Sequence, residues 1–315
     1  MSRITVAVSE STFKTAFGLL QRNFAMRLEE TVTLGAVRAG IDARARLENG
    51  DVSLRQDGTV KVGELDLRWS RLTLSLEIDL PSICVGGGCI GTRWLRICLP
   101  RYCVFTAATD VSVAVDLAPY VGQEVSFESA FAVRYWDPAA PGPDGPDPCE
   151  PVRDLLVAGE LLDAFPTDRK QWHVHLAPGP VDVDLFDFPD VAGDLVEGAL
   201  RNAVVGLLPE GPARTLVLAV IGSATDLIRT VLDAPDDFEE WLSDLFNVSF
   251  GLLDVVIQVV AAYFGRCIPL FRIDDPFVVM EAEGDLLPVS IPIDDVKITA
   301  DDDELVITAD IGAGT

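Results

Sequence analysis

The chain has few of the residues on which most enzymes and nucleic-acid-binding proteins depend. Two of its 315 residues are histidines and four are lysines, whereas 50 are Asp or Glu. Neither the Gly-x-Ser-x-Gly motif of serine hydrolases nor the His-Glu-x-x-His motif of zinc proteases occurs. Nucleic-acid binding requires basic residues that neutralise phosphates, and this chain has no basic run and a net charge of −26. We therefore expect a protein that is not an enzyme, needs no cofactor and binds no nucleic acid.

Uninterrupted hydrophobic runs long enough to cross a membrane are also missing. A spanning helix needs about 20 mostly apolar residues. The two most apolar stretches carry polar residues at helical spacing; they are Thr215–Leu232, with Asp226 and Arg229, and Val248–Phe264, with Asp254 and Gln258. This pattern predicts mostly buried helices, each with one polar face toward solvent, and no transmembrane span. The first residues lack a basic segment followed by an apolar run, which predicts a cytoplasmic protein or one exported without a cleaved signal peptide.

What the chain has in abundance is hydrophobicity combined with acidity. Hydrophobic residues make up 49% of the sequence, and the mean hydropathy is +0.30. Disordered acidic chains have low hydrophobicity, so this composition predicts a folded protein with a large apolar interior. Acidic residues alternate with apolar ones, as in Leu65-Asp66-Leu67 and Val181-Asp182-Val183-Asp184. On a strand this alternation places charge on one face and apolar side chains on the other.

The N-terminal segment predicts a strand followed by a helix. Arg3–Ser9 alternates in the manner of a short strand. Ser9 or Ser11 is then a candidate cap for a helix from about Glu10 to Leu28, whose apolar residues recur at three- and four-residue steps.

The next fifty residues predict long strands separated by turns. Turn signals occur at Asn49-Gly50-Asp51 and at Gln56-Asp57-Gly58. Apolar residues then alternate through Leu65–Leu80, but the parity of the alternation slips at Ser70-Arg71. A strand keeps one apolar face through such a slip only if it contains a β-bulge. We therefore expect one long, curved strand with a bulge at this point.

The remainder of the chain predicts strands, then helices, then strands again. Strands are expected at Val111–Leu117, Val125–Tyr135, Trp172–Leu176 and Val181–Leu185, with a proline-rich loop at 137–151. Helical spacing follows at 191–208, 214–232, 236–246 and 248–264. The last strands are expected at Phe271–Met280, Leu287–Ile293 and Leu305–Ile311, and Asp301–Glu304 is expected to form a solvated hairpin turn.

This order of elements resembles the tubular lipid-binding (TULIP) superfamily, which includes the bactericidal/permeability-increasing proteins and bacterial members from toxin-associated operons. The resemblance lies in the strand that leads into an amphipathic helix at 4–28, in the long bent strands of 41–80 and 104–135, and in the apolar helix Asp190–Leu208 with its closing strands at 269–311. It implies an α+β fold in which a long, highly curved antiparallel sheet wraps around apolar helices. It also implies a single domain over 1–315, to which this chain adds a cysteine-rich hairpin (81–105), a proline-rich loop (137–151) and a helical insertion (211–265).

For function, the resemblance implies that the protein binds or transfers a lipid or another hydrophobic small molecule in an apolar tube. The residues that line the tube under this hypothesis are Phe13, Phe17, Phe24, Leu72, Leu74, Leu76, Ile78, Val111, Val113 and Val115. The alternative is a structural or assembly protein of the same fold, whose interior is filled by its own helices. Such a protein acts through contacts with a protein partner or with a second copy of itself.

Four cysteines form a symmetric pattern, Cys84-x4-Cys89-x8-Cys98-x4-Cys103. In a hairpin centred near Arg93-Trp94, Cys84 faces Cys103 and Cys89 faces Cys98, at a separation close to that of a disulfide. Free thiols and a four-thiolate zinc site are the alternatives. A regular ribbon places the two pairs on opposite faces, which disfavours zinc.

The only two histidines, His173 and His175, share one face of an expected strand. Such a pair suits a metal, but no third ligand lies nearby in the sequence, and metal sites need three or four ligands. We therefore expect an exposed strand face and no metal site.

Overall fold

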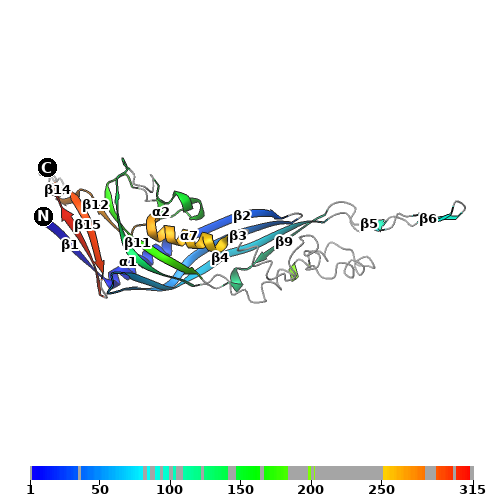
Figure 1. Cartoon of the computed structure of the whole chain (residues 1–315), viewed down its shortest axis with the longest axis horizontal. Helices are drawn as coiled ribbons and strands as arrows, with labels where there is room; N and C mark the ends of the chain where they lie inside the picture. The colour runs from blue at the N-terminus through cyan, green and yellow to red at the C-terminus, as the bar shows by residue number, and fades with distance from the viewer. Residues whose placement is uncertain are drawn as a thin grey trace.

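The structure, a computed structural model, describes residues 2–34, 37–80, 84–85, 89–92, 95–98, 102–103, 109–121, 124–140, 147–163, 167–183, 198–199, 202, 251–280, 289–300 and 303–312. Within these residues the chain is an α+β protein built mostly from antiparallel strands (Figure 1). The expected helices at 191–208, 214–232 and 236–246 lie outside the described residues, apart from helical positions at 198–199 and 202.

The larger sheet has seven strands. Its order is β12 (Phe271–Asp274), β11 (Gln171–Val183), β10 (Glu124–Trp136), β4 (Val60–Leu80), β3 (Val37–Leu54) and β2 (Ala25–Leu34), and β9 (Thr109–Asp116) also pairs with β4. The smaller sheet has the order β1 (Ser2–Ser9), β16 (Glu304–Ile311) and β15 (Ile293–Ala300). Three further antiparallel pairs are β13 (Phe277–Met280) with β14 (Val289–Ile291), β5 (Cys84–Val85) with β8 (Tyr102–Cys103), and β6 (Cys89–Thr92) with β7 (Leu95–Cys98).

The described helices are short, and two of them contribute aromatic side chains to the core. They are α1 (Glu10–Asn23), η1 (Ala118–Tyr120), η2 (Glu150–Leu155), α2 (Glu160–Asp163), α7 (Leu252–Ala262) and the π-helical turn η4 (Tyr263–Cys267) that continues α7. In Figure 1, β1, β15 and β14 lie at one end of the molecule, and β5 and β6 lie at the opposite end, beyond β9.

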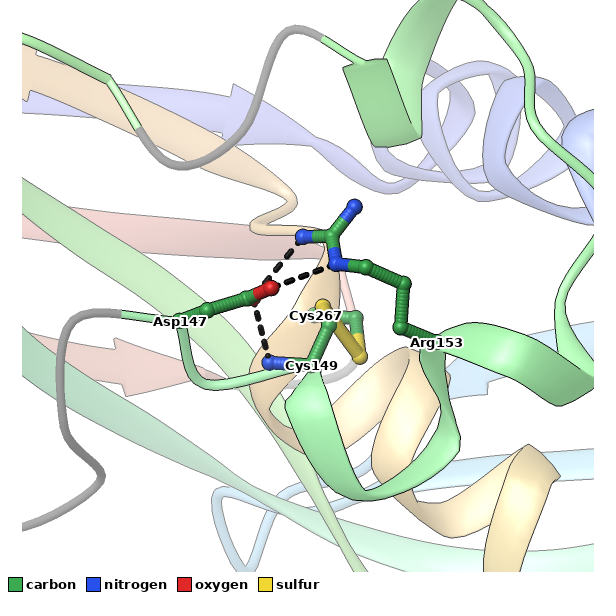
Figure 2. Close-up of a disulfide and its surroundings, with 4 residues drawn as sticks. All are labelled: Asp147, Cys149, Arg153 and Cys267. Atoms are coloured by element: carbon green, nitrogen blue, oxygen red, sulfur yellow. Dashed lines mark hydrogen bonds and ion pairs between the residues drawn. A yellow bond between two sulfur atoms is a disulfide. The ribbon is translucent and has the colours of Figure 1, made fainter.

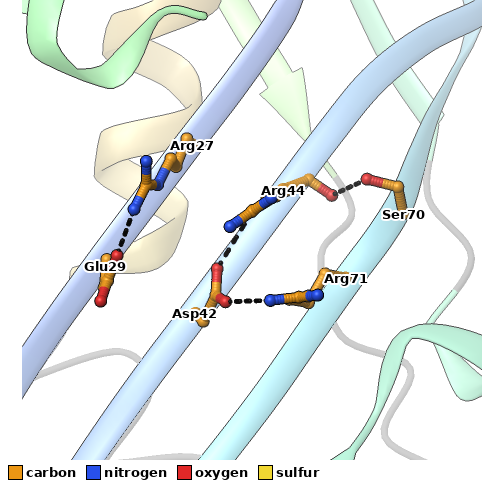
Figure 3. Close-up of polar contacts among 6 residues, drawn as sticks. All are labelled: Arg27, Glu29, Asp42, Arg44, Ser70 and Arg71. Carbon is orange, nitrogen blue, oxygen red and sulfur yellow. Dashed lines mark hydrogen bonds and ion pairs between the residues drawn. The ribbon is translucent and has the colours of Figure 1, made fainter.

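The predicted bulge in the long strand β4 is confirmed. Arg44 of β3 pairs with Arg71, whereas the next residue, Ala45, pairs with Trp69, so that Ser70 is the extra residue. The Ser70 hydroxyl donates a hydrogen bond to the carbonyl oxygen of Arg44 at 3.3 Å (Figure 3). Trp69 and Leu72, on either side of the slip, are both buried. The bulge therefore keeps the apolar residues of both halves of β4 on the interior face.

Charged side chains occupy the outer face of β3 and β4. Figure 3 shows Asp42 between two guanidinium groups, with Asp42 Oδ2 at 2.8 Å from Arg71 and Oδ1 at 3.4 Å from Arg44. The hydrogen bond from Arg71 lowers the pKa of the Asp42 carboxyl below its ordinary value. This pairing agrees with the expectation that alternate positions of each strand carry the charge.

One of the two predicted turns is wrong. Gln56-Asp57-Gly58 forms the connection between β3 and β4, as expected, but Asn49-Gly50-Asp51 lies inside β3. Asn49 and Gly50 have φ angles of 54° and 96°, so this is a local irregularity in a continuing strand. A Cβ atom at Gly50 would lie 2.6 Å from Leu65 Cδ2, which explains why glycine stands there. The strand continues because pairing with β4 resumes at once, with Asp51 opposite Gly63.

The first helix is shorter than the expected range of Glu10 to Leu28. Ser9 is its N-cap and accepts a hydrogen bond from the Thr12 N–H, which satisfies one free donor of the first turn. The helix ends at Asn23, because Phe24 adopts an extended conformation and Ala25 begins β2. Helical periodicity at Leu28 was misleading, since pairing of β2 along the length of β3 overrides local propensity.

Other expected strands differ in their limits. Trp172–Leu176 and Val181–Leu185 belong to one strand, β11, as far as its described end at Val183. Phe271–Met280 is divided into β12 and β13 at Asp275-Pro276, where a proline interrupts the ladder. β15 begins at Ile293 and pairs with β16 so that Ala300 faces Leu305. Asp301 and Asp302 of the expected hairpin turn lie outside the described residues.

One hydrophobic core joins both sheets to α1 and α7. The ring of Phe17 stacks on Phe264 with centroids 5.4 Å apart, and Phe24 meets Tyr263 edge to face at 5.1 Å. The Tyr263 hydroxyl donates a hydrogen bond to the carbonyl oxygen of Leu20 at 2.8 Å. Burial raises the pKa of the Tyr263 hydroxyl well above its ordinary value. The start of the chain and a helix near residue 260 thus stabilise each other through aromatic contacts.

Replacing Phe17 with alanine should lower the free energy of unfolding by about 3–5 kcal/mol, because the packed core fills the resulting cavity incompletely. Leu19→Ala on the same helix is the matched control: Leu19 is 49% exposed, and its truncation should change stability by no more than about 0.5 kcal/mol. Urea unfolding followed by circular dichroism measures both variants. Equal losses would contradict the buried position of Phe17.

Candidate functional site

The structure places most of the predicted tube-lining residues in the interior. Their positions are as follows: Phe13, Phe17, Phe24, Leu72, Leu74 and Leu76 are buried, and Val113 and Val115 are half-buried against the core. The side chains of Ile78 and Val111 lie outside the described part of the structure. Antiparallel pairing of β4 with β9 sets Leu74 opposite Val115 and Leu76 opposite Val113. The two predicted strand sets are therefore neighbours.

The three phenylalanines of this set contact other aromatic rings of the protein. Phe13 meets Phe131 of β10 edge to face at 5.9 Å, and Phe17 and Phe24 contact Phe264 and Tyr263 as described above. Whether any residue of the set also contacts a ligand stays a prediction.

A separate pocket of about 410 Å³ lies at the end of the molecule that carries β1, β15 and β16. We call it the apolar groove. It is lined by Ile4, Val6, Arg272, Ile273, Asp274, Phe277, Val278, Ile293, Ile307 and Ala309. Its volume falls within the range typical of small-molecule sites, which are apolar with a few placed polar groups.

Strand alternation and register explain how this groove forms. Antiparallel pairing of β1 with β16 sets Ile4 opposite Ala309 and Val6 opposite Ile307, so these four side chains share one face of the smaller sheet. The facing wall comes from β12 and β13. In that wall Val278 is 49% exposed. Contiguous exposed apolar surface on a soluble protein marks an interaction site more often than a scattered apolar residue does.

Charged groups lie at the β12 side of the groove. Asp274 accepts a hydrogen bond from the Gln171 side-chain amide at 2.6 Å. Arg272 reaches solvent, but the surrounding protein removes part of its hydration, and this desolvation lowers the pKa of its guanidinium. The neighbouring Asp275 accepts hydrogen bonds from the Tyr135 hydroxyl at 2.9 Å and from the Ile293 N–H at 3.0 Å, which connects the start of β15 to the larger sheet. A ligand in the groove would thus meet apolar walls and, at one side, both the guanidinium of Arg272 and the carboxylate of Asp274.

Sequence reasoning missed the groove. Its one local signal is Phe277-Val278-Val279-Met280, four consecutive apolar residues after a proline, all of them exposed in the structure. The contribution of β1, β15 and β16 depends on contacts between segments almost 300 residues apart, which no local pattern reveals.

The cysteine hairpin has the backbone register expected from its symmetry. β5 and β8 pair Cys84 with Cys103, and β6 and β7 pair Cys89 with Cys98. The side chains of these four cysteines lie outside the described part of the structure, so the choice among disulfides, free thiols and zinc stays a prediction.

A disulfide between Cys149 and Cys267 was not predicted. Its Cα atoms are 5.0 Å apart and it joins positions separated by 118 residues (Figure 2). Asp147 stabilises the segment before η2: its carboxylate accepts hydrogen bonds from the Cys149 N–H at 2.9 Å and from Arg153 Nη2 at 2.8 Å. The hydrogen bond from Arg153 lowers the pKa of Asp147. No spacing in the sequence relates these two cysteines, because only the fold brings η2 to the end of η4.

The expectation that His173 and His175 lie on an exposed strand face is wrong. Their side chains are only 2% and 1% exposed. Burial lowers the pKa of His173 to about 4 and that of His175 to about 3, and the positive charges of Arg134 and Arg272 add to the effect at His175. His173 Nε2 lies 3.1 Å from the Gln171 side-chain oxygen. Packing of η4 against β11 is the tertiary contact that the strand pattern did not predict.

Within the described residues, no group of three or more His, Cys, Asp or Glu side chains is arranged to hold a metal ion. The described helices also include none whose length and hydrophobicity would let it span a membrane. No protein-family model matches the chain, and no curated protein matches it.

The double variant Cys149→Ser/Cys267→Ser should lose about 2–5 kcal/mol of stability, because the disulfide restricts the unfolded chain over a long loop. Urea unfolding of the variant beside the wild-type protein measures the loss. Mass spectrometry of a non-reduced digest should yield the Cys149–Cys267 cross-linked peptide, and recovery of both peptides as free thiols would refute the assignment.

The two buried histidines should make stability depend on pH. Each has a folded-state pKa below the unfolded value of about 6.5. Between pH 6.5 and about 4 the unfolded chain therefore binds protons that the folded chain does not, and stability falls as the pH falls, by up to about 1.4 kcal/mol per pH unit for each histidine.

His175→Leu should make this dependence shallower, by up to about 1.4 kcal/mol per pH unit. Urea unfolding of the variant and of the wild-type protein at a series of pH values between 4.5 and 7 measures this difference. The titration of carboxylates contributes equally to both proteins and cancels in the comparison. Parallel curves would contradict a neutral, buried His175.

Proposed function

We propose that this protein is a non-enzymatic binding or transfer protein for a lipid or another hydrophobic small molecule, and that the apolar groove holds the apolar part of that ligand. The observation that carries the proposal is the pocket of about 410 Å³ between the smaller sheet and β12–β13, with Val278 half-exposed in its wall. Burying such surface against an apolar ligand is favourable by roughly 25 cal/mol for each Å² removed from water.

The proposal includes the TULIP-like architecture, with a curved sheet wrapped around apolar helices. Its support is the bulged strand β4, the antiparallel pairing of β2, β3, β4 and β9, and the contacts of α1 and α7 with one core. A bulge bends a strand and increases its twist, which is what a wrapped sheet requires.

The alternative function, a structural or assembly protein filled by its own helices, is favoured by one specific observation. Phe17 of α1 stacks on Phe264 beside α7, so protein side chains occupy this part of the interior. A ligand in the apolar groove does not require that space. The two proposals therefore make different predictions. The binding hypothesis predicts a ligand in the apolar groove, whereas the assembly hypothesis predicts stable oligomers and no ligand.

We also propose that the protein works in an oxidising compartment. The Cys149–Cys267 disulfide supports this choice over the cytoplasm, since disulfides persist mainly outside reducing compartments.

Val278→Asp should abolish ligand binding at the groove, because it places a carboxylate in the apolar wall. Val279→Asp is the matched control: it adds the same charge to the next residue of the same strand, and Val279 is exposed but does not line the groove. Titration with an uncharged fluorescent fatty alcohol should show at least about tenfold weaker binding for Val278→Asp, a loss of about 1.4 kcal/mol, and little change for Val279→Asp.

Solvent extraction of the purified protein followed by mass spectrometry should recover an uncharged hydrophobic molecule from the wild-type protein and from Val279→Asp, but not from Val278→Asp. A wild-type protein that yields no such molecule and does not bind the probe would refute the proposal. Equal binding by both variants would place the ligand elsewhere.

A further inference from the structure

A second pocket, of about 460 Å³, lies over β10 and β11 between η2 and the α7–η4 helix. We call it the arginine pocket. It is lined by Arg134, Pro151, Val152, Ala177, Pro178, Gln258, Ala261, Ala262, Gly265 and Arg266. None of these residues lines the apolar groove, so the two pockets are separate.

The charge of this pocket is opposite to that of the protein. The chain has 50 acidic and 24 basic residues, yet among the described residues that line the pocket the charged ones are two arginines. Within the described residues no carboxylate forms an ion pair with Arg266. Guanidinium groups bind carboxylate and phosphate with paired, charge-assisted hydrogen bonds.

The remaining lining is mostly apolar. Val152, Pro151 and Pro178 form part of the walls, and Gln258 adds an amide that can donate a hydrogen bond. A pocket with cations and apolar walls suits an oxyanion attached to a small apolar body better than it suits an inorganic ion alone.

The pocket walls are held in place before any ligand binds. The Cys149–Cys267 disulfide (Figure 2) joins the start of η2 to the end of η4. The lining residue Arg266 directly precedes Cys267 in the chain. Asp147 is engaged by Arg153 and by the Cys149 N–H, so its carboxylate is already neutralised on the η2 side. A Cβ atom at Gly265 would lie 3.3 Å from Pro178 Cδ, which shows how closely η4 approaches β11. Walls that are rigid in the free protein reduce the ordering cost of binding.

We infer that the arginine pocket binds a carboxylate- or phosphate-bearing small amphiphile, with Arg134 and Arg266 contacting the oxyanion. This site does not depend on the proposed function of the apolar groove. The shared chemistry is the oxyanion, which a fatty acid, a phosphorylated lipid fragment or free phosphate can supply.

Calorimetric titration of the full-length, oxidised protein tests the inference with four probes: octanoate, octyl phosphate, inorganic phosphate and uncharged octanol. Octanoate or octyl phosphate should bind, and octanol should not bind at this pocket. If inorganic phosphate binds as tightly as octyl phosphate, the pocket is a site for the free anion. That result would support the contact with an oxyanion and refute the need for an apolar body on the ligand.

Arg266→Gln should weaken binding of the charged amphiphile by at least about tenfold, and Arg266→Lys, which keeps the charge but loses the forked geometry, should weaken it less. Arg55→Gln is the matched control, since it removes the same charge from an arginine that pairs with Glu128 outside the pocket. No binding of any charged probe to the wild-type protein, or equal binding to wild-type, Arg266→Gln and Arg266→Lys proteins, would overturn the inference.

Val278→Asp separates this result from that of the apolar groove. It should leave binding of the charged amphiphile at the arginine pocket unchanged, while Arg266→Gln should leave the uncharged fatty-alcohol probe in the groove. Loss of the charged amphiphile in Val278→Asp but not in Arg266→Gln would show that the groove is its site and would refute the second pocket.

Discussion

The register slip at Ser70 is the constraint on which the rest of the structure depends. β4 pairs with β3 along most of its length, with β10 over its first half and with β9 over its second. Side chains of a strand alternate between its two faces with a period of two. Without the extra residue Ser70, β4, which has 21 residues, would therefore turn half of its apolar side chains toward solvent. The bulge keeps Leu67 and Leu72 in the same interior. One strand can therefore support three neighbours and a single continuous core.

The interior that this sheet supports is joined across the chain by aromatic contacts. Phe17 on Phe264 and Phe24 on Tyr263 connect α1 to a helix about 240 residues later. The pockets considered above lie at the margins of this core and differ in chemistry. The apolar groove offers aliphatic surface beside Arg272, whereas the arginine pocket offers two guanidinium groups among small apolar residues.

Much of the strand arrangement could be predicted because its signals are local. Alternation along 65–80 and the slip at Ser70-Arg71 predicted a long bulged strand, and the symmetric spacing of four cysteines predicted which of them face each other across a hairpin. The same reasoning failed at Leu28, where a helical spacing coincided with a strand, and at Asn49-Gly50, where a turn signal became an irregularity within β3. In both places pairing with a distant strand outweighed local preference.

The sequence by itself determined the α+β class, the charged outer faces of the strands and the apolar helix faces, because each follows from the spacing of neighbouring residues. Only the tertiary structure decided the burial of His173 and His175, the partner of Cys149 and the two pockets. These features arise where η4 packs on β11 and where β1 and β16 meet the β12–β13 segment. Contacts between residues a hundred or more positions apart depend on how whole elements pack, and this packing cannot be predicted from a local sequence pattern.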